Sequence, residues 1–395
     1  MVCYEPQHTV PVEFPLDIVC FSPGLPHDGT TLAQRSLGGS ETATIELARC
    51  WAQMGHHVVC FAPQAQPGTI DGVTWYPIEQ YAAYVGAMPH DVTVISRDVS
   101  VLQARPQSGL VVLWCHDLAH KRLRPMLAGA FWQLDGVVVQ SAFQKRQYQS
   151  IFPGLPDDYA VVVGNGLNLT DIDRVGSVRK HVPPALIFGS RPERGLETAL
   201  RLMQHFWQSG RQDIVLHAST YESFAPGPLA ALYQQLLQQA QQMPNVRIHG
   251  SLKRADWYRL LASGAALIYP GVPGEFREIS CIVSMEALAL GLPVVTIGQG
   301  AVPETAGPGA IVVGDEQTNV ADLSYVPAFA AGCLQAIQDG VAMEPICRAH
   351  GRQQTWQAAA ERASAWFTAK LLARSNDPWR VRRHAERVGD RGLAA

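Results

Sequence analysis

Short runs of β-branched and other apolar residues recur along the chain, with helical patterns between them. Six such runs lie in the first half, at 16–21, 57–62, 92–96, 110–114, 136–140 and 160–163. Six more lie in the second half, at 185–189, 213–217, 246–248, 266–269, 293–297 and 310–314. The runs are continuously apolar and do not alternate, which predicts strands that are covered on both faces. Because helical segments separate them, we expect doubly wound parallel sheets.

Several of the segments between the strands have a clear helical pattern. Helices are predicted over 40–55, 228–243, 255–264 and 354–373, and another is expected to begin near Gly195. The first of them is expected to begin with Ser40 as its cap and to stop at Gly55. Strand–helix alternation through the whole chain therefore predicts an α/β protein.

The length and one polar stretch predict two domains. A chain of 395 residues is long for a single hydrophobic core. The polar segment 173–184 contains Gly and a Pro-Pro pair, and it follows the last strand of the first half. Two sheets on either side of this link would form a cleft, with ligands at the carboxyl ends of the strands.

The amino-acid composition indicates which kinds of molecule the protein can bind and in which compartment it is expected. A hydrophobic content of 47% with 16% charged residues is typical of a globular chain. The net charge of −3 gives no general attraction for nucleic acid, although local positive charge could bind an anionic substrate. Eight cysteines without a CxxC pair favour buried thiols in a reducing compartment over a zinc site. Without a signal peptide or a membrane-length apolar run, we expect a soluble cytoplasmic protein.

In the first half, polar and glycine residues follow two of the predicted strands. Gly38 and Gly39 precede Ser40 at a helix start, where a ligand can approach the backbone and free N–H groups attract phosphate. An ordinary turn is the alternative. His116 and Asp117 follow the strand at 110–114, where a polar pair is hard to explain as core, although a structural His is not excluded.

In the second half, two arginines follow the strand at 185–189. Arg191 and Arg194 lie just before the predicted helix start, and two guanidinium groups at this place can bind a diphosphate without metal. The alternative is a solvated turn in which these arginines pair with Glu193 and Glu197.

The segment 278–295 places a carboxylate inside an otherwise apolar helix. Ser280 is a candidate cap, and the N–H groups of Ile279, Ser280 and Cys281 would point at an anion beside Glu278. Glu286 follows within the helix, where a buried and unpaired carboxylate would be costly. It is explained if it accepts hydrogen bonds from the vicinal hydroxyls of a ribose; the alternative is that it faces solvent.

Together these motifs resemble those of a known family. The sequence EISCIVSMEALALGLPVV (278–295) is similar to the E-x7-E signature of retaining glycosyltransferases of the GT-B fold, the GT4-type group 1 family. The motifs GGSE (38–41), HD (116–117), VVVQSAFQK (137–145), GNGLNLTDID (164–173) and RG (194–195) occur in the family's order. The resemblance covers most of residues 16–370 and implies two Rossmann-like domains that face each other across a cleft.

The resemblance also implies a domain plan and a reaction. It implies an acceptor-side domain over 1–175, a donor-binding domain over 176–365, and a closing helix with an Arg-rich tail over 366–395. The expected reaction moves a sugar, with retention, from a UDP-, GDP- or ADP-sugar to a hydroxyl acceptor, which could be a glycan, a lipid-linked acceptor or a small molecule. No permanently bound cofactor and no metal are implied, and retention is expected along a same-face path.

Site residues are implied one by one. Glu286 would hold the ribose, Glu278 would contact the transferred sugar, and Arg194 would take the place of the usual Lys and neutralise the diphosphate. His116 would touch the sugar, and Gly39 would approach the phosphates. The catalytic candidates are thus His116, Glu278 and Arg194, and the remaining donor-binding candidates are Gly38, Gly39, Arg191, Ile279, Ser280, Cys281 and Glu286.

Some departures from the family pattern keep alternatives open. The chain has EISC where the family often has E-G-F-G, and Arg191 lies only three residues before Arg194. A non-catalytic GT-B partner, a sugar-nucleotide epimerase and a pyridoxal-phosphate-dependent phosphorylase are therefore alternatives. The Arg-rich tail could contact anionic lipid, or it could be solvated.

Overall fold

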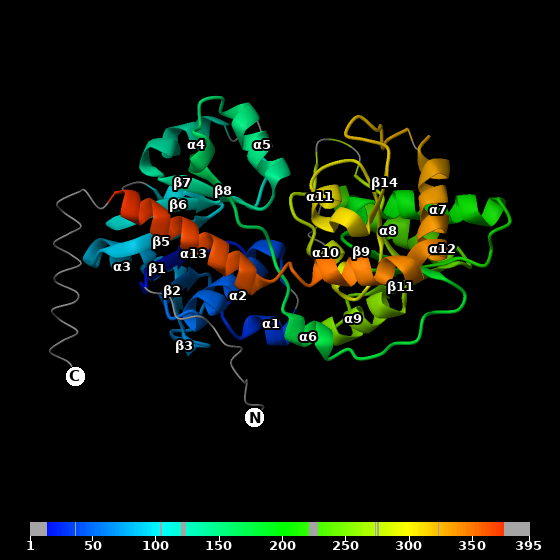
Figure 1. Ribbon diagram of the computed structural model, residues 1–395, viewed down its shortest axis with the longest axis horizontal. Helices are drawn as coiled ribbons and strands as arrows, with labels where there is room; N and C mark the ends of the chain where they lie inside the picture. Colours follow the sequence, from blue (N-terminus) through cyan, green and yellow to red (C-terminus); the bar gives the residue numbers. More distant parts are fainter. Residues whose placement is uncertain are drawn as a thin grey trace. The chain divides into compact units, whose positions relative to one another are not determined.

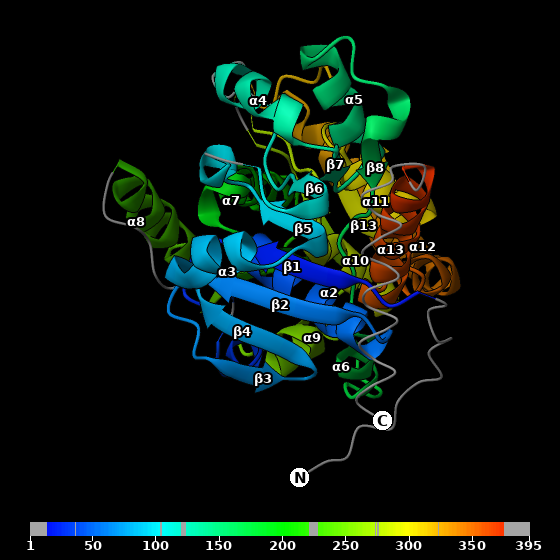
Figure 2. The same ribbon diagram turned by 90° about the vertical axis from the view of Figure 1, so that its left-hand side faces the viewer.

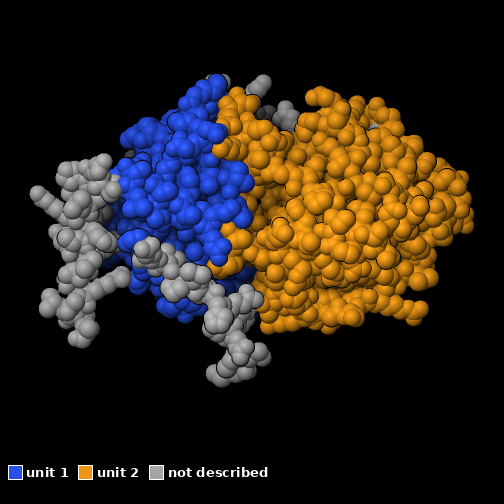
Figure 3. Space-filling view, viewed as in Figure 1, with its two compact units in different colours: residues 1–139, 151–163, 359–395 blue, residues 140–150, 164–358 orange. Residues whose placement is uncertain are grey.

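The computed structural model describes residues 14–35, 37–102, 105–119, 124–220, 228–272, 274, 276–322 and 324–374. The elements are shown in Figure 1. The chain forms two compact units, coloured in Figure 3. Unit 1 comprises 1–139, 151–163 and 359–395, and unit 2 comprises 140–150 and 164–358. The domain boundaries expected from the sequence, at 175/176 and 365/366, stay a prediction.

Unit 1 contains an eight-stranded sheet with strand order β3-β4-β2-β1-β5-β6-β7-β8. Figure 2 shows most of this order from bottom to top. Every pairing is parallel except that of β3 with β4. The chain therefore runs outward from β1 on one side and returns to β5 on the other, which is the doubly wound arrangement. The strands are β1 (Asp17–Phe21), β2 (His57–Ala62), β3 (Gly68–Ile70), β4 (Val73–Pro77), β5 (His90–Ser96), β6 (Ser108–Trp114), β7 (Gly136–Val139) and β8 (Ala160–Val162).

The helices of the first part of the chain are α1 (Thr31–Gln34), α2 (Gly39–Gln53), α3 (Tyr81–Ala87), α4 (Arg124–Ala130) and α5 (Ala142–Ile151). Most of α5 belongs to unit 2, because Glu304 accepts hydrogen bonds at 2.6 and 2.9 Å from the backbone N–H groups of Ala142 and Phe143. Helix α13 (Trp356–Ala373) brings the chain back to unit 1, where the Trp51 indole donates to the carbonyl of Ala360 at 3.2 Å.

Unit 2 contains a six-stranded, all-parallel sheet with strand order β11-β10-β9-β12-β13-β14. In sequence terms this is the order 3-2-1-4-5-6 of the Rossmann fold, and the order reverses between β9 and β12. The strands are β9 (Ala185–Gly189), β10 (Val215–Ser219), β11 (Val246–Gly250), β12 (Ala266–Tyr269), β13 (Val294–Ile297) and β14 (Ala310–Val313).

Helices cover both faces of the unit 2 sheet. Helices α7, α8 and α12 pack on one face around Phe188, Phe206 and Phe329, and α9, α10 and α11 pack on the other around Ile187 and Leu288. Neighbouring residues of β9 thus enter opposite cores, as expected for a strand. The helices are α6 (Leu169–Asp173), α7 (Leu196–Gln208), α8 (Pro228–Gln241), α9 (Arg254–Ser263), α10 (Ile282–Ala289), α11 (Val302–Ala306) and α12 (Val326–Gly351).

The predicted α/β architecture and parallel sheets are confirmed. Each of the twelve predicted runs overlaps a strand, and the predicted helices are present as α2, α7, α8, α9 and α13. Two predicted caps are wrong: Gly38, and not Ser40, caps α2, and Cys281, and not Ser280, caps α10. Seven of the eight cysteines lie in the described residues, and all seven are buried, as predicted.

Candidate functional site

Arg194 and Glu278 meet at the switch point of the unit 2 sheet. Arg194 follows β9 in a short helical turn (Pro192–Arg194), and Glu278 lies in the loop between β12 and α10. Arg194 Nη1 donates to Glu278 Oε2 at 3.3 Å. The guanidinium carbon also lies 4.7 Å from the ring centroid of Phe276, within range of a cation–π contact. A guanidinium and a carboxylate are thus held side by side at the place where open α/β sheets bind ligands.

The local backbone explains why this turn contains glycine. Gly195 has a φ of +113°, a conformation that side chains disfavour. A Cβ at this position would lie 2.7 Å from the carbonyl oxygen of Gly271. Glycine therefore allows the turn after β9 to pack closely against the loop after β12, which brings Arg194 to Glu278.

The carboxylate of Glu278 is held on both oxygens. Besides Arg194, the hydroxyl of Tyr269 donates to Oε2 at 3.1 Å. Oε1 accepts from the N–H groups of Ile279 at 3.0 Å and Ser280 at 3.4 Å. Two of the N–H groups expected to point at an anion therefore bind the motif's own carboxylate, and this arrangement fixes Glu278 in orientation.

Helix α10 begins one residue later than the sequence pattern indicates. Cys281 is the cap residue and makes no side-chain cap hydrogen bond, while the carbonyl of Ser280 accepts from Asn165 Nδ2 at 3.3 Å. Ser280 and Cys281 are both buried. Burial raises the pKa of the Cys281 thiol to about 12, and Glu278 adds to this rise, so the thiol is neutral at neutral pH.

Glu286 lies one turn into α10 and is buried, with 9% of its surface exposed. The alternative that it faces solvent is therefore wrong. Its Oε2 accepts from the indole N–H of Trp257 at 2.8 Å, and its Oε1 accepts from the hydroxyl of Tyr258 at 3.2 Å. Burial raises the pKa of Glu286, while the hydrogen bond from Trp257, the charge of Arg254 and the hydrogen bond from Tyr258 lower it.

Arg191 is placed differently from Arg194. Its side chain is 55% exposed, and Nη1 lies 3.9 Å from Glu193 Oε1. Glu193 in turn accepts a hydrogen bond from Tyr233 on α8. The pairing with Glu193 named above as an alternative is therefore present, at the longest distance that counts as an ion pair.

In unit 1, the two glycines before α2 lie in different surroundings. A Cβ on Gly38 would come within 2.5 Å of Glu41 Oε2, so this glycine makes room for a buried acid. That acid accepts from Ser40 Oγ at 3.0 Å and from the N–H of Leu25 at 3.2 Å, which ties the loop after β1 to the start of α2. A Cβ on Gly39 would meet none of the described residues within 4 Å, so they leave the space beside it open.

His116 follows β6 in the same unit and is partly exposed. Its ring lies 4.5 Å from that of Trp114, and its Nε2 is enclosed without a hydrogen-bond partner among the residues that the structure describes. Burial, with the nearby charge of Arg97, lowers the pKa of His116 to about 3, so the ring is neutral at neutral pH.

Asp117 is joined to the loop after β5. Arg97 Nε and Nη2 donate to its two carboxylate oxygens at 2.7 and 2.8 Å. Arg97 also reaches Ser40 Oγ at 3.3 Å and has a φ of +64°, which is unusual for a residue with a side chain. The carboxyl ends of β1, β5 and β6 thus contribute to one polar cluster.

The structure gathers the predicted site residues into two groups. Arg194, Glu278, Ile279, Ser280 and Cys281 lie around the switch point of unit 2, while Gly38, Gly39 and His116 lie at the carboxyl ends of the unit 1 strands. Tyr269, Trp257, Tyr258, Phe276 and Arg97 were not predicted. A polar or aromatic residue at the last position of a strand, as in ALIYP, or directly after it, as in VISRD, is the signal that could have found Tyr269 and Arg97.

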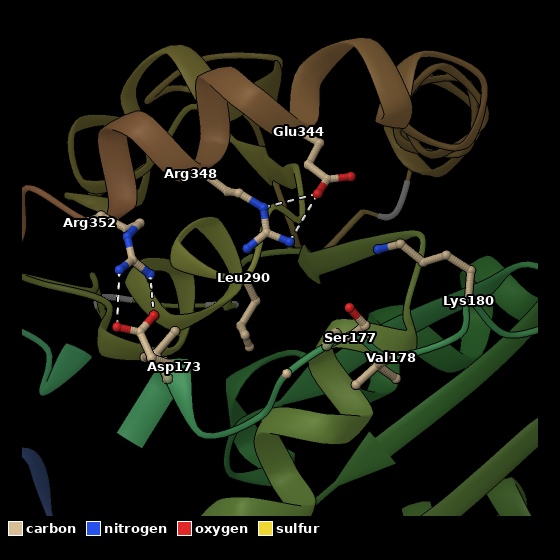
Figure 4. Close-up of a pocket in the computed structure, with 11 residues that line it drawn as sticks. Asp173, Ser177, Val178, Lys180, Leu290, Glu344, Arg348 and Arg352 are labelled. Carbon is tan, nitrogen blue, oxygen red and sulfur yellow. Dashed lines mark hydrogen bonds and ion pairs between the residues drawn. The ribbon is translucent and has the colours of Figure 1, made fainter. Parts of the chain in front are cut away.

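A pocket beside Glu278, lined in part by Tyr269, Phe276 and Gln299, has a volume of only about 10 Å³. A larger pocket of about 490 Å³ lies at the other end of α10 (Figure 4). It is lined by Ile172, Asp173, Gly176, Ser177, Val178, Lys180, Ala262, Leu290, Glu344, Arg348 and Arg352.

Two cations of the larger pocket donate hydrogen bonds to backbone carbonyls at the C-terminal ends of helices. Lys180 Nζ donates to the carbonyl of Gly264 after α9 at 3.0 Å, and Arg348 donates to the carbonyl of Ala289 at the end of α10 at 3.4 Å. Arg348 and Arg352 also pair with Glu344 and Asp173, as the dashed lines in Figure 4 mark. Because cations favour helix C-termini, these contacts have a structural explanation, and size alone does not make this pocket the reactive site.

Two further predictions concern membranes. Within the described ranges, no helix combines the length and the apolar character needed to cross a bilayer. The Arg-rich tail beyond residue 374 lies outside the described residues. Arg374 itself donates to the carbonyl of Gly109 at 3.1 Å and pairs with Asp135.

Comparison with known proteins identifies the fold. Sucrose-phosphate synthase from Thermosynechococcus elongatus is similar with a TM-score of 0.66 and 15% identity, over 90% of this chain and 100% of that one. A UDP-forming α,α-trehalose-phosphate synthase from Burkholderia xenovorans gives 0.68 and 11%, over 90% and 100%. The catalytic domain of starch synthase IV from Arabidopsis thaliana, bound to ADP and acarbose, gives 0.65 and 12%, over 91% and 100%.

The sequence itself carries a family assignment in unit 2. No curated protein sequence matches this one significantly. Residues 184–339 match the family described as glycosyl transferases group 1, a range that includes Arg194, Glu278 and Glu286. The chain thus has the GT-B fold of these glycosyltransferase structures, and its residues 184–339 are similar to the glycosyl transferases of group 1.

Proposed function

We propose that this chain is a retaining glycosyltransferase that moves a sugar from a nucleoside-diphosphate donor to a hydroxyl acceptor without a bound metal. The observation that carries the proposal is the Arg194–Glu278 pair at the switch point of unit 2, within the range that matches the group 1 family. Two of the similar structures, a UDP-forming synthase and a synthase domain bound to ADP, support a nucleotide-linked sugar as donor. Hexosyl transfer is the form of the reaction that we propose.

Arg194 is proposed to stabilise the leaving diphosphate. Its guanidinium is held on Phe276 and already contacts an anionic oxygen of Glu278. A guanidinium can donate to two phosphate oxygens at once, and a fixed cation beside developing negative charge lowers the barrier to transfer. Arg191 would add a second positive charge from the edge of the site, as its exposure indicates.

Glu278 is proposed to contact the transferred sugar. Its carboxylate is fixed by Tyr269 and by the N–H groups of Ile279 and Ser280, so it would present a defined acceptor to sugar hydroxyls. We do not assign it as a nucleophile, and we propose that retention follows a same-face path with an oxocarbenium-like transition state. Ser280 and Cys281 would shape the adjoining backbone at the start of α10.

Glu286 is proposed to hold the donor's ribose. Among the described residues, each of its oxygens has one donor, and an ionised carboxylate oxygen accepts about two hydrogen bonds. One acceptor position on each oxygen would then serve the vicinal hydroxyl groups. A buried acid with this remaining capacity is explained by a polar ligand.

Unit 1 is proposed to carry the acceptor and to complete the donor's contacts. Gly39 would approach the phosphates through the open space beside it, with Gly38 keeping the loop in place. His116, neutral at the working pH, would contact the sugar through Nε2. The seven buried thiols fit a reducing compartment, which supports a cytoplasmic location.

The test uses UDP-, GDP- and ADP-sugars with sugar and lipid-linked acceptors, with detection of the released nucleoside diphosphate and of the product anomer by NMR. We expect transfer with retention from one donor class, equal with and without EDTA. The variant Glu286→Ala is expected to weaken binding of the nucleoside diphosphate. No turnover with any donor, an inverted product, or loss of activity in EDTA would each contradict the corresponding part of the proposal.

A further inference from the structure

Trp257 and Tyr258 are consecutive residues of α9, and together they hold one carboxylate on α10. The Trp257 indole N–H donates to Glu286 Oε2 at 2.8 Å, and the Tyr258 hydroxyl donates to Oε1 at 3.2 Å. Tyr258 is 2% exposed, so its hydroxyl is surrounded by protein. The two donors therefore take one acceptor position on each oxygen and prevent the carboxylate from rotating freely.

The Trp257 ring is itself positioned by a glycine at the switch point. A Cβ on Gly189, the last residue of β9, would lie 2.1 Å from Cη2 and 2.6 Å from Cζ2 of the indole. The benzene edge of the ring thus lies against Gly189 while its N–H reaches Glu286. The carboxyl end of β9, α9 and α10 are joined through this one side chain.

The two donors also affect the charge of the carboxylate. Burial alone favours the neutral acid and raises the pKa of Glu286. The hydrogen bond from Trp257 opposes this most strongly, followed by the charge of Arg254 and the hydrogen bond from Tyr258. Removal of the indole N–H would therefore leave Glu286 protonated at higher pH than in the native protein.

We propose that Trp257 and Tyr258 are positioning residues for nucleotide recognition: they orient the Glu286 carboxylate so that the second acceptor position of each oxygen meets one of two vicinal ribose hydroxyls. The inference rests on the proposed function and deepens it. It names the part of the donor that is read, a ribose with both hydroxyls, and the residues through which Glu286 reads it. Gly189 takes part by allowing the indole into its place.

The test compares binding of UDP, GDP and ADP with that of their 2′-deoxy forms by isothermal titration calorimetry, between pH 5 and pH 8. The variants are Trp257→Phe, Tyr258→Phe, Gly189→Ala and Glu286→Gln. Trp207→Phe, on the partly exposed end of α7, serves as the control for loss of an indole. Thermal unfolding of each variant shows whether the fold is kept.

The native chain is expected to prefer the best ribonucleotide over its deoxy form by roughly ten- to hundred-fold, as for a hydrogen bond to a charged group. Trp257→Phe and Tyr258→Phe should each lose most of this preference while binding of the deoxy form changes little. In Trp257→Phe the loss of affinity on acidification should also begin at higher pH. Gly189→Ala should behave like Trp257→Phe, because it displaces the ring without touching Glu286.

The outcomes separate the inference from the proposed function. If Glu286→Gln abolishes the preference while the Trp257, Tyr258 and Gly189 variants keep it with a native pH profile, the positioning role is wrong and the proposed function stands. If Glu286→Gln keeps native affinity for the ribonucleotide, the ribose role of Glu286 is wrong and the positioning role falls with it. If no nucleotide binds the native chain, the proposed function is wrong as well. If Gly189→Ala does not fold, the two Phe variants decide the question.

Discussion

Gly300 packs closely against the backbone of Glu278, so a substitution at this position should displace Glu278. It has a φ of +65°, and a Cβ there would lie 2.8 Å from the carbonyl oxygen and 3.1 Å from the amide nitrogen of Glu278. The N–H of the next residue, Ala301, donates to the same carbonyl at 2.7 Å. The substitution Gly300→Ala therefore strains its own backbone and also pushes on the residue proposed to contact the sugar.

Gly176 provides a matched control. Its φ is +66°, nearly that of Gly300, but a Cβ on it would meet nothing within 4 Å. Both Ala variants should therefore lose about 1–2 kcal/mol through the left-handed backbone conformation. Only Gly300→Ala adds the contact with Glu278, and overpacking of this kind costs a further ~1–3 kcal/mol.

The two variants should differ in stability and more strongly in catalysis. For a unit of this size, each kcal/mol corresponds to roughly 2–4 °C in melting temperature, so Gly300→Ala should melt several degrees below Gly176→Ala. The contact at 2.8 Å is about 0.6 Å short of an ordinary van der Waals contact, so Glu278 must shift by a similar amount. Since a displacement of about 1 Å can cost 100-fold, we expect roughly a tenfold loss of kcat/KM.

Thermal unfolding and steady-state transfer kinetics on the two variants and the native chain measure these differences. Equal melting temperatures for the two Ala variants would show that the space beneath Glu278 is less restricted than the distances indicate. A Gly300→Ala variant with native kcat/KM would show that the position of Glu278 does not matter for transfer. Either result would refute the reasoning from this close approach.

Further predictions concern three arginines of the two units and one buried histidine. Arg194→Met should lower kcat by about 10²–10³-fold, as for the loss of one transition-state donor, whereas Arg194→Lys should retain much of the rate. Arg191→Met should have a smaller effect than Arg194→Met, and equal losses in these two variants would contradict this prediction. Arg97→Met should reduce kcat/KM for transfer while the melting temperature stays within a few degrees, because exposed ion pairs such as Arg97–Asp117 contribute little; native kinetics would exclude a role for that cluster. Burial lowers the pKa of His56 to about 4, and its Nδ1 accepts from the N–H of Leu16 at 3.0 Å. The contribution of neutral His56 to the free energy of unfolding should therefore be fully present above about pH 6.5 and should be lost as the pH drops towards 4. Denaturant unfolding from pH 7.5 to 4.5 should show a shallower pH dependence for His56→Gln, and an unchanged slope would show that other groups dominate.

Twelve strands could be predicted, because buried parallel strands require continuous apolar runs. Among the described helices, α2, α7, α8, α9, α10 and α13 could be predicted from their patterns. Strands β3 and β4 were not predicted: β3 has only three residues, all at least partly exposed, so burial leaves no pattern there. Helix α12 was not predicted either, and it contains Pro345 in its interior, a residue that normally marks the end of a helix. Both cases depend on packing that a local pattern does not contain.

The candidate site was predictable in part. Arg194, Glu278 and Glu286 belong to motifs with fixed spacing, so their places could be expected in advance. Tyr269, Trp257 and Tyr258 act through contacts between residues 9 to 29 positions apart in sequence, and nothing local distinguishes them from core aromatics. The predicted caps at Ser40 and Ser280 were wrong for a related reason. The Ser40 hydroxyl has another partner, since it donates to Glu41, and the backbone N–H of Ser280 is held by the Glu278 carboxylate before the helix begins.

The neighbouring glycines before α2 should have different evolutionary histories. Gly38 is required by the bulk of the acid at position 41, so a larger residue at 38 should occur in relatives only together with a shorter side chain at 41. Position 39 is under no such restriction from its own unit, and its variation should instead follow the size of whatever molecule each relative binds. An alignment of relatives could therefore distinguish, residue by residue, the glycine retained for architecture from the one retained for chemistry.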